Sequence, residues 1–157
     1  RRRVGALVVF EQKTGLKDIA DTGMAIDATI SGALLINIFE PNTPLHDGAV
    51  IVRGTRIVAA ACVLALSDAS NISRDLGTRH RAGLGISEST DAVVLIVSEE
   101  TGIISMAQAG KLTRHLDAED LGRVLSNLYH DQRPTFRDAL RAVGGRLRPG
   151  KQTTDDQ

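Results

Sequence analysis

Gly5-Ala6-Leu7-Val8-Val9-Phe10 is an unbroken apolar run that ends at the charged Glu11. A run of this length and composition is typical of a β-strand that is buried on both faces. The run Ala92-Val93-Val94-Leu95-Ile96-Val97 is the clearest further example in the chain. Strands of this kind lie inside a sheet that other elements cover on each side, so these two runs decide the fold class.

Shorter strands and helices are predicted around these two runs. Ser31 is a suitable N-cap for a helix that extends to Phe39, and Pro41 prevents its continuation. Because this helix is mostly apolar, we expect it to be largely buried. Further strands are predicted at residues 24–30, 49–52, 56–66 and 103–107, with a hairpin turn at Arg53-Gly54-Thr55.

Capping residues and apolar spacing predict three more helices. One covers residues 78–89, and two others begin at Asp117 and Thr135. The whole pattern predicts an α/β fold with a mixed central β-sheet flanked by helices on both faces. We expect residues 1–145 to form one domain and residues 146–157 to form a disordered tail.

The charge balance excludes a general role in binding polyanions. Of the 157 residues, nineteen are Lys or Arg and nineteen are Asp or Glu, which gives a formal net charge of +0. Phosphate binding must therefore come from local placement of charge rather than from a basic field. With one Tyr, three Phe and no Trp, the chain also lacks a base-stacking platform, so no nucleic-acid partner is predicted.

The cysteine content, the length of the apolar runs and the first three residues indicate in which cellular compartment the chain resides. Cys62 is the single cysteine and cannot form an internal disulfide, which fits a reducing compartment. No apolar stretch reaches the roughly 18 residues that suggest a membrane span. The chain begins at Arg1-Arg2-Arg3 without a Met, so we expect a fragment, and these arginines are either the cytoplasmic flank of a membrane helix or an ordinary solvated cluster.

A first polar cluster, Leu45-His46-Asp47-Gly48-Ala49, precedes the strand predicted at residues 49–52. An Asp-Gly pair by itself is common in tight turns. Here Gly48 would let the backbone approach a ligand, Asp47 could take a proton from a hydroxyl or hold a metal ion, and His46 offers a neutral nitrogen ligand. A plain turn and a catalytic cluster both remain open for this segment.

A second cluster, Gly77-Thr78-Arg79-His80-Arg81, stands at the start of a predicted helix. Two arginines there oppose the helix dipole, which favours anions at this end. A bound phosphate would resolve the conflict, because Thr78 as N-cap, the free amides and both guanidinium groups would form an anion pocket. The alternative is a solvated helix start in which His80 only packs.

A third cluster, Ser98-Glu99-Glu100, follows the buried strand predicted at residues 92–97. Ligands of open α/β sheets usually bind at such strand ends. Two glutamates after a strand are commonly a solvated loop, but a carboxylate here could hold a divalent cation while Ser98 donates to a phosphate oxygen. Together the three clusters offer what phosphoryl transfer needs, namely carboxylates, an imidazole and guanidinium groups.

The longer motifs Pro44-Leu45-His46-Asp47-Gly48-Ala49 and Leu76-Gly77-Thr78-Arg79-His80-Arg81-Ala82 resemble the signature motifs of bacterial diadenylate cyclases of the membrane-anchored CdaA type. The likeness covers about residues 3–115. It implies the catalytic-domain fold of that family and the conversion of two ATP molecules into cyclic di-AMP and two pyrophosphates, with Mg²⁺ or Mn²⁺ required. It also implies a tether to the cytoplasmic face of the plasma membrane through N-terminal segments absent from this chain.

The resemblance implies a partner and a role for individual residues. In that family two subunits meet face to face, and each 3′-hydroxyl attacks the α-phosphorus of the other nucleotide, so a homodimer is needed. Asp47 and Arg79 are the catalytic candidates, and His46, Asp47 and Glu100 are the metal candidates. The candidate nucleotide contacts are Gly48, Ala49, Leu64, Gly77, Thr78, Arg79, His80, Arg81, Ser98 and Glu99.

One position departs from the family pattern. Relatives often carry a Tyr before the Leu that meets adenine through its backbone, and here that pair is Val63-Leu64. Stacking on an aromatic ring contributes roughly 1–3 kcal/mol per base, so we predict weaker adenine binding in this chain.

Two other functions are compatible with these residues. A non-catalytic module would use the same pocket to sense ATP or the cyclic dinucleotide, and ligand binding would stabilise it without forming product. A metal-dependent phosphohydrolase would release phosphate or AMP, but the lack of further His and Asp ligands disfavours this class.

Overall fold

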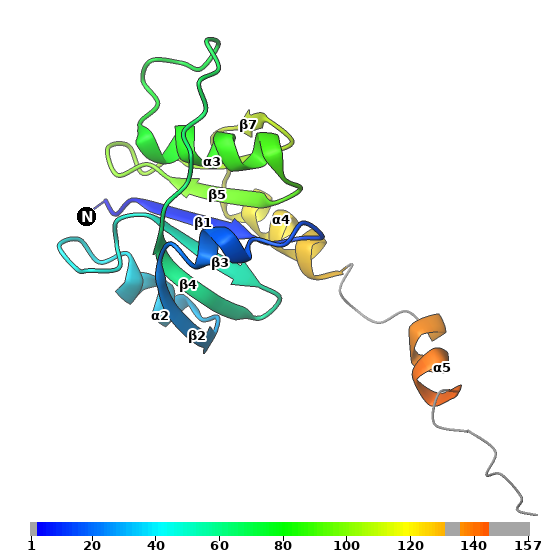
Figure 1. Ribbon diagram of the computed structural model, residues 1–157. Helices are drawn as coiled ribbons and strands as arrows, with labels where there is room; N and C mark the ends of the chain where they lie inside the picture. Colours follow the sequence, from blue (N-terminus) through cyan, green and yellow to red (C-terminus); the bar gives the residue numbers. More distant parts are fainter. Residues whose placement is uncertain (1–2, 131–135, 145–157) are drawn as a thin grey trace, which may run out of the picture. The chain divides into compact units, whose positions relative to one another are not determined.

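The structure is a computed structural model that describes residues 3–130 and 136–144 (Figure 1). Within these residues one sheet has the strand order β2-β4-β3-β1-β5-β6-β7. β1 pairs in parallel with β3 and antiparallel with β5, and the other neighbours are antiparallel, so the sheet is mixed as predicted. The strands are β1 (Ala6–Phe10), β2 (Met24–Thr29), β3 (Ala49–Arg53), β4 (Arg56–Cys62), β5 (Val93–Val97), β6 (Ile104–Gln108) and β7 (Lys111–Thr113).

The central strands are buried on both faces, as their apolar runs predict. Leu7 and Val9 of β1 pack in the main hydrophobic cluster, which also contains Leu84 of helix α3 (Thr78–Ser89). Val8 and Phe10 alternate with them, point to the opposite face, and are buried as well. The first apolar run is therefore the centre of the fold.

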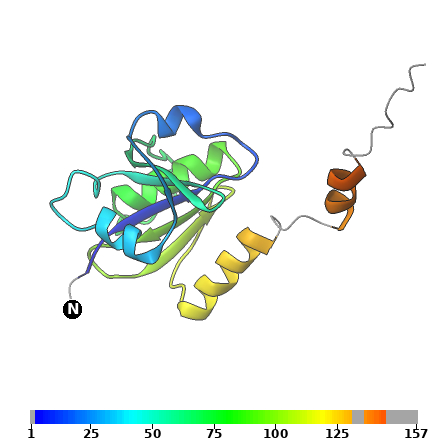
Figure 2. The same cartoon turned by 90° about the horizontal axis from the view of Figure 1, so that it is seen from below.

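Helices lie on both sides of the sheet. Figure 2 shows α1 and α3 on one side and α2 on the other. The helices are α1 (Lys17–Ala20), α2 (Gly32–Ile38), α3 (Thr78–Ser89), α4 (Ala118–His130) and α5 (Phe136–Gly144). The chain divides into two compact units, Arg1–Leu121 and Gly122–Gln157, and the first holds the whole sheet with α1, α2 and α3. The tail predicted at residues 146–157 lies outside the described residues.

Helix α2 begins as predicted but is less buried than predicted. The Ser31 hydroxyl accepts a hydrogen bond from the Leu34 amide at 3.1 Å, which is the expected N-cap. Ile38 is buried, but Ile36 is 71% exposed. The expectation of a largely buried helix is wrong, because a helix on one face of a sheet buries only the side that faces the strands.

Strand β4 is shorter than the predicted strand at residues 56–66. It ends at Cys62, and the chain then leaves the sheet and crosses to α3, where the Ser67 amide donates to the Arg81 carbonyl at 2.9 Å. Local apolar sequence cannot reveal this exit, since the partner of Ser67 is distant in the chain. The apolar pattern also does not predict β7, which has only three residues.

No helix in the described part of the chain is long and apolar enough to span a bilayer.

Candidate active site

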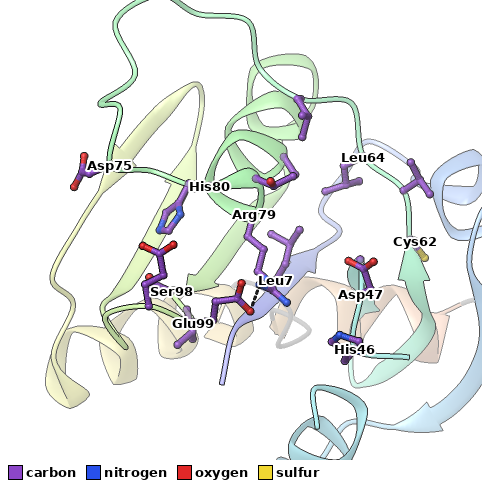
Figure 3. A pocket seen from close by; sticks show the side chains of 18 residues that line it. Leu7, His46, Asp47, Cys62, Leu64, Asp75, Arg79, His80, Ser98 and Glu99 are labelled. Atoms are coloured by element: carbon purple, nitrogen blue, oxygen red, sulfur yellow. Dashed lines mark ion pairs between the residues drawn. The ribbon is translucent and has the colours of Figure 1, made fainter. Parts of the chain in front are cut away.

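A cavity of about 510 Å³ collects the three polar clusters (Figure 3). Its walls come from the segment before β3, the segment after β4, the start of α3 and the loop after β5. The lining residues are Leu7, His46, Asp47, Gly48, Cys62, Val63, Leu64, Leu66, Asp75, Gly77, Thr78, Arg79, His80, Ala82, Val97, Ser98, Glu99 and Glu100.

One wall carries the carboxylate of Asp47. Gly48 has a φ of +117°, and a Cβ atom there would lie 2.7 Å from the carbonyl oxygen of Cys62, so only glycine lets the chain enter β3 so close to β4. The close approach expected of Gly48 is thus made to β4. Asp47 is exposed and makes no hydrogen bond or ion pair with another described residue. Its carboxylate points into the cavity and is free to meet a ligand (Figure 3).

The ring of His46 stands beside Asp47 and is oriented by the backbone. Its Nδ1 lies 2.6 Å from the carbonyl oxygen of Thr43. A carbonyl only accepts hydrogen bonds, so Nδ1 carries the proton and Nε2 keeps its lone pair in the neutral ring. This is the arrangement by which proteins orient a histidine that binds a metal ion.

The start of α3 forms part of the opposite wall. The N-cap of this helix is Gly77 rather than the expected Thr78, and no side chain caps the helix. The first-turn amides therefore lack a side-chain acceptor. Backbone amides at such an end, together with the helix dipole, favour an anion.

Arg79 reaches from α3 into the cavity and is paired with Glu99. The Nη1 and Oε2 atoms lie 3.0 Å apart, as the dashed line in Figure 3 marks, and the side chains are 21% and 64% exposed. An ion pair with one exposed partner is worth at most about 1 kcal/mol. A phosphate with several charged oxygens can therefore replace Glu99 as the partner of Arg79.

His80 is buried at one end of the cavity. Burial lowers the pKa of its ring, the charge of Arg114 lowers it further, and Asp75 opposes both effects. Asp75 and Arg114 form an ion pair of 3.2 Å. His80 is thus a neutral side chain at pH 7. It lines the cavity next to this ion pair.

Ser98 begins the loop that connects β5 with β6. Its hydroxyl oxygen accepts a hydrogen bond from the Thr101 amide at 3.2 Å. A hydroxyl that accepts this bond still has a proton to donate to a ligand. Glu100 follows in the same loop, is exposed, and lines the cavity.

The comparisons with known proteins identify the family. A family model described as "DisA bacterial checkpoint controller nucleotide-binding" (DAC) matches residues 1–112. The chain belongs to the DAC family. This confirms the resemblance that the two sequence motifs indicate.

Relatives and a solved structure agree with the DAC assignment. The chain is 54% identical over 125 residues to a diadenylate cyclase of Listeria monocytogenes and 55% identical to the cyclic di-AMP synthase CdaA of Bacillus subtilis. Each match covers 80% of this chain and 46% of the relative, so the chain spans about half the length of these proteins. The crystal structure of a double mutant of DacA from Staphylococcus aureus matches with a TM-score of 0.80 and 55% identity over 82% of this chain and 85% of that chain, which confirms the α/β fold.

Two of the expected site residues of this DAC chain, Ala49 and Arg81, do not line the cavity. Ala49 is fully buried in β3 and belongs to the hydrophobic core. Arg81 is two positions after Arg79, and at 3.6 residues per turn such side chains project from opposite sides of a helix. Arg79 therefore lines the cavity without Arg81, and the expected anion pocket with two guanidinium groups stays a prediction.

The cavity also has apolar lining residues that no sequence pattern singles out. Leu7, Ala82 and Val97 line it from β1, α3 and β5, and Leu66, which is 53% exposed, lines it from the segment after β4. Cys62 also lines it, and burial raises the pKa of this thiol to about 11. Their apolar side chains gave no signal that separates them from the core. Asp75 gives no signal either, because it lies within a polar loop.

The donors for a metal ion are divided between the walls. Within the described part of the chain, no three His, Cys, Asp or Glu side chains are close enough to hold a metal ion together. Mg²⁺ is usually bound by one or two carboxylates together with substrate phosphates rather than by a complete protein cage. The oriented His46 ring and the free Asp47 carboxylate fit an ion of this kind, which the DAC chain would share with a triphosphate.

Proposed function

We propose that this chain is a diadenylate cyclase domain that condenses two ATP molecules into cyclic di-AMP and two pyrophosphates. The observation that carries the proposal is that one cavity is shared by the guanidinium group of Arg79 and the carboxylate of Asp47, which has no partner among the described residues. Membership of the DAC family and the names of the relatives support it.

The cavity can receive one ATP molecule in a defined direction. Arg79, the amides at the start of α3 and the Ser98 hydroxyl would hold the triphosphate, with Thr78 and His80 beside them. Val63 and Leu64, on the segment after β4, would contact the adenine. Gly48 and Glu99 would lie near the nucleotide between these ends.

In the reaction, Asp47 would accept the proton of the 3′-hydroxyl. The hydroxyl oxygen would then form a bond to the α-phosphorus of the second ATP, and the bond from that phosphorus to the bridging oxygen would break, which releases pyrophosphate. Arg79 would stabilise the negative charge on the phosphate oxygens. A second, equivalent step would close the ring of cyclic di-AMP.

His46 and Asp47 would hold Mg²⁺ or Mn²⁺ together with the phosphates, and Glu100, on the loop after β5, stays a predicted ligand. When bound, the cation would neutralise charge that develops on the phosphate oxygens. The oriented Nε2 lone pair of His46 supports this assignment.

A homodimer would be the active form. A cavity that binds one ATP cannot supply both nucleotides, so a facing copy of the chain would bring the second. The predicted attachment to the cytoplasmic face of the plasma membrane stays a prediction, since the chain spans about half the length of its relatives.

The direct test is a chromatographic analysis of the products after incubation with ATP and each metal ion. We expect cyclic di-AMP and pyrophosphate, with a rate that rises as the square of protein concentration at low concentration. Binding of ATP without product would instead support a sensing module, and release of phosphate or AMP would support a phosphohydrolase.

A further inference from the structure

Gly5 lies immediately before β1 and belongs to none of the three polar clusters. It is buried, and the antiparallel register that pairs Ala6 with Val97 places it beside the start of the Ser98-Glu99-Glu100 loop. Arg79 approaches the same place from α3, as its position in front of β1 in Figure 3 shows. Three segments that are distant in sequence therefore meet at Gly5.

The space above Gly5 is occupied by the head group of Arg79. A Cβ atom at this position would lie 2.6 Å from Nη1 and 2.7 Å from Cζ of Arg79, and 3.0 Å from Cβ of Glu99. Carbon atoms in contact normally stay about 3.5–4.0 Å apart, so a side chain at Gly5 and the observed guanidinium group exclude each other. The guanidinium group is thus held between the bare backbone of Gly5 and the carboxylate of Glu99.

We propose that Gly5 is a positioning residue for the triphosphate site, because its lack of a side chain fixes the place of the Arg79 guanidinium group. The inference rests on the proposed function for the identity of the ligand, a nucleoside triphosphate. It adds a residue outside the sequence motifs and assigns it an effect that acts through the guanidinium group of Arg79, whose ion-pair partner Glu99 is the other close neighbour.

The flexibility of the Arg79 side chain allows the proposal to be tested in a folded variant. The two atoms nearest to the added Cβ belong to the far end of the long, flexible side chain of Arg79, and the third is Cβ of the exposed Glu99, so none of them is a backbone atom. The Gly5→Ala variant is therefore expected to fold, with the guanidinium group displaced from its place. A displacement of about 1 Å in a positioned group can reduce function by up to about 100-fold.

The test compares the binding of a non-hydrolysable ATP analogue with the binding of adenosine. In Gly5→Ala we expect the analogue to bind about tenfold more weakly and adenosine to bind as in the parent chain. Gly15→Ala is the matched control, since no atom lies within 4 Å of a Cβ there, and it should leave both affinities unchanged. An equal loss for adenosine, or an unchanged affinity for the analogue in a folded Gly5→Ala variant, would overturn the proposal.

A double-mutant comparison separates positioning from a merely structural effect. Arg79→Ala removes the group that Gly5 positions, so adding Gly5→Ala to it should cause no further loss of analogue binding. A further tenfold loss in that background would show that Gly5 acts by another route and would refute the proposal. These binding measurements do not need turnover, so a chain that binds the analogue but makes no cyclic di-AMP would disprove the cyclase and leave the role of Gly5 standing.

Discussion

The two walls of the cavity differ in how their charged groups are held. Asp47, before β3, is exposed and has no hydrogen-bonding or ionic partner among the described residues, whereas Arg79, on α3, is mostly buried and already paired with Glu99. An unpaired carboxylate can accept a proton from a substrate, and a cation fixed in place can hold one. This difference supports the proposal that Asp47 serves the reaction and Arg79 holds the triphosphate, so substitutions of the two residues should impair different steps.

The largest effect is expected for Asp47→Asn. The amide keeps the shape of the carboxylate but does not accept the proton, so the rate of cyclic di-AMP formation should fall by about 10²–10⁴-fold, as measured by chromatography. Without a divalent cation, the affinity for an ATP analogue should change by no more than about twofold, because Asp47 then serves only the reaction. Asp68→Asn, at an exposed site outside the cavity, is the control. Turnover retained in Asp47→Asn would remove this residue from its proposed role.

Arg79→Ala should chiefly impair binding. Hydrogen bonds to a charged group contribute about 1.5–3 kcal/mol, so the affinity for the ATP analogue should fall by roughly 10- to 100-fold in a calorimetric titration. Arg81→Ala is the matched variant, because Arg81 is close in sequence but outside the cavity, and its effect should stay below about threefold. Equal losses in both variants would contradict the proposed role of Arg79 in holding the triphosphate.

Val63→Tyr should increase the affinity for adenine at the apolar end of the same cavity. Val63 is 69% exposed and lines the cavity, so a larger ring has space to stack on adenine. Even the lower end of the stacking contribution, about 1 kcal/mol, predicts an affinity for adenosine about fivefold higher. Met24→Tyr places the same ring at another exposed apolar site and should have no such effect. An unimproved affinity in Val63→Tyr would show that the missing aromatic residue does not limit adenine binding.

The smallest effect concerns His80 and the pH dependence of stability. Burial holds the pKa of this ring below its ordinary value of 6.5, so the unfolded chain binds more protons than the folded chain as the pH falls through this region. The free energy of unfolding should therefore decrease as the pH falls below about 6.5. In urea titrations, His80→Gln should show a shallower decrease than the parent chain. Identical slopes in the two proteins would mean that the ring is not shielded from water.

Much of the fold can be predicted from local sequence, because its decisive signals are local. The run at β1 is apolar without alternation, which indicates burial on both faces, and Ser31 is read correctly as an N-cap. The end of β4 and the exposure of Ile36 cannot be predicted in this way. Both depend on which distant element covers the segment, and apolar composition does not carry that information.

The candidate site shows the same difference between local signals, which the sequence reveals, and contacts of distant segments, which it does not. The charged clusters could be found because each stands at the end of a strand or the start of a helix, where side chains of different segments converge. The exclusion of Arg81 follows from helix periodicity and could have been anticipated. By contrast, the pairing of Asp75 with Arg114 and the seat that Gly5 provides for Arg79 arise from contacts between distant segments. No spacing in the sequence marks them.

The most direct test of the separation between the walls is a crystal structure of the Asp47→Asn variant with ATP and Mg²⁺. We predict that Arg79 leaves Glu99 and contacts the triphosphate, and that the ribose 3′-hydroxyl faces position 47. A triphosphate bound against the His46 wall, with Arg79 still paired to Glu99, would contradict the account.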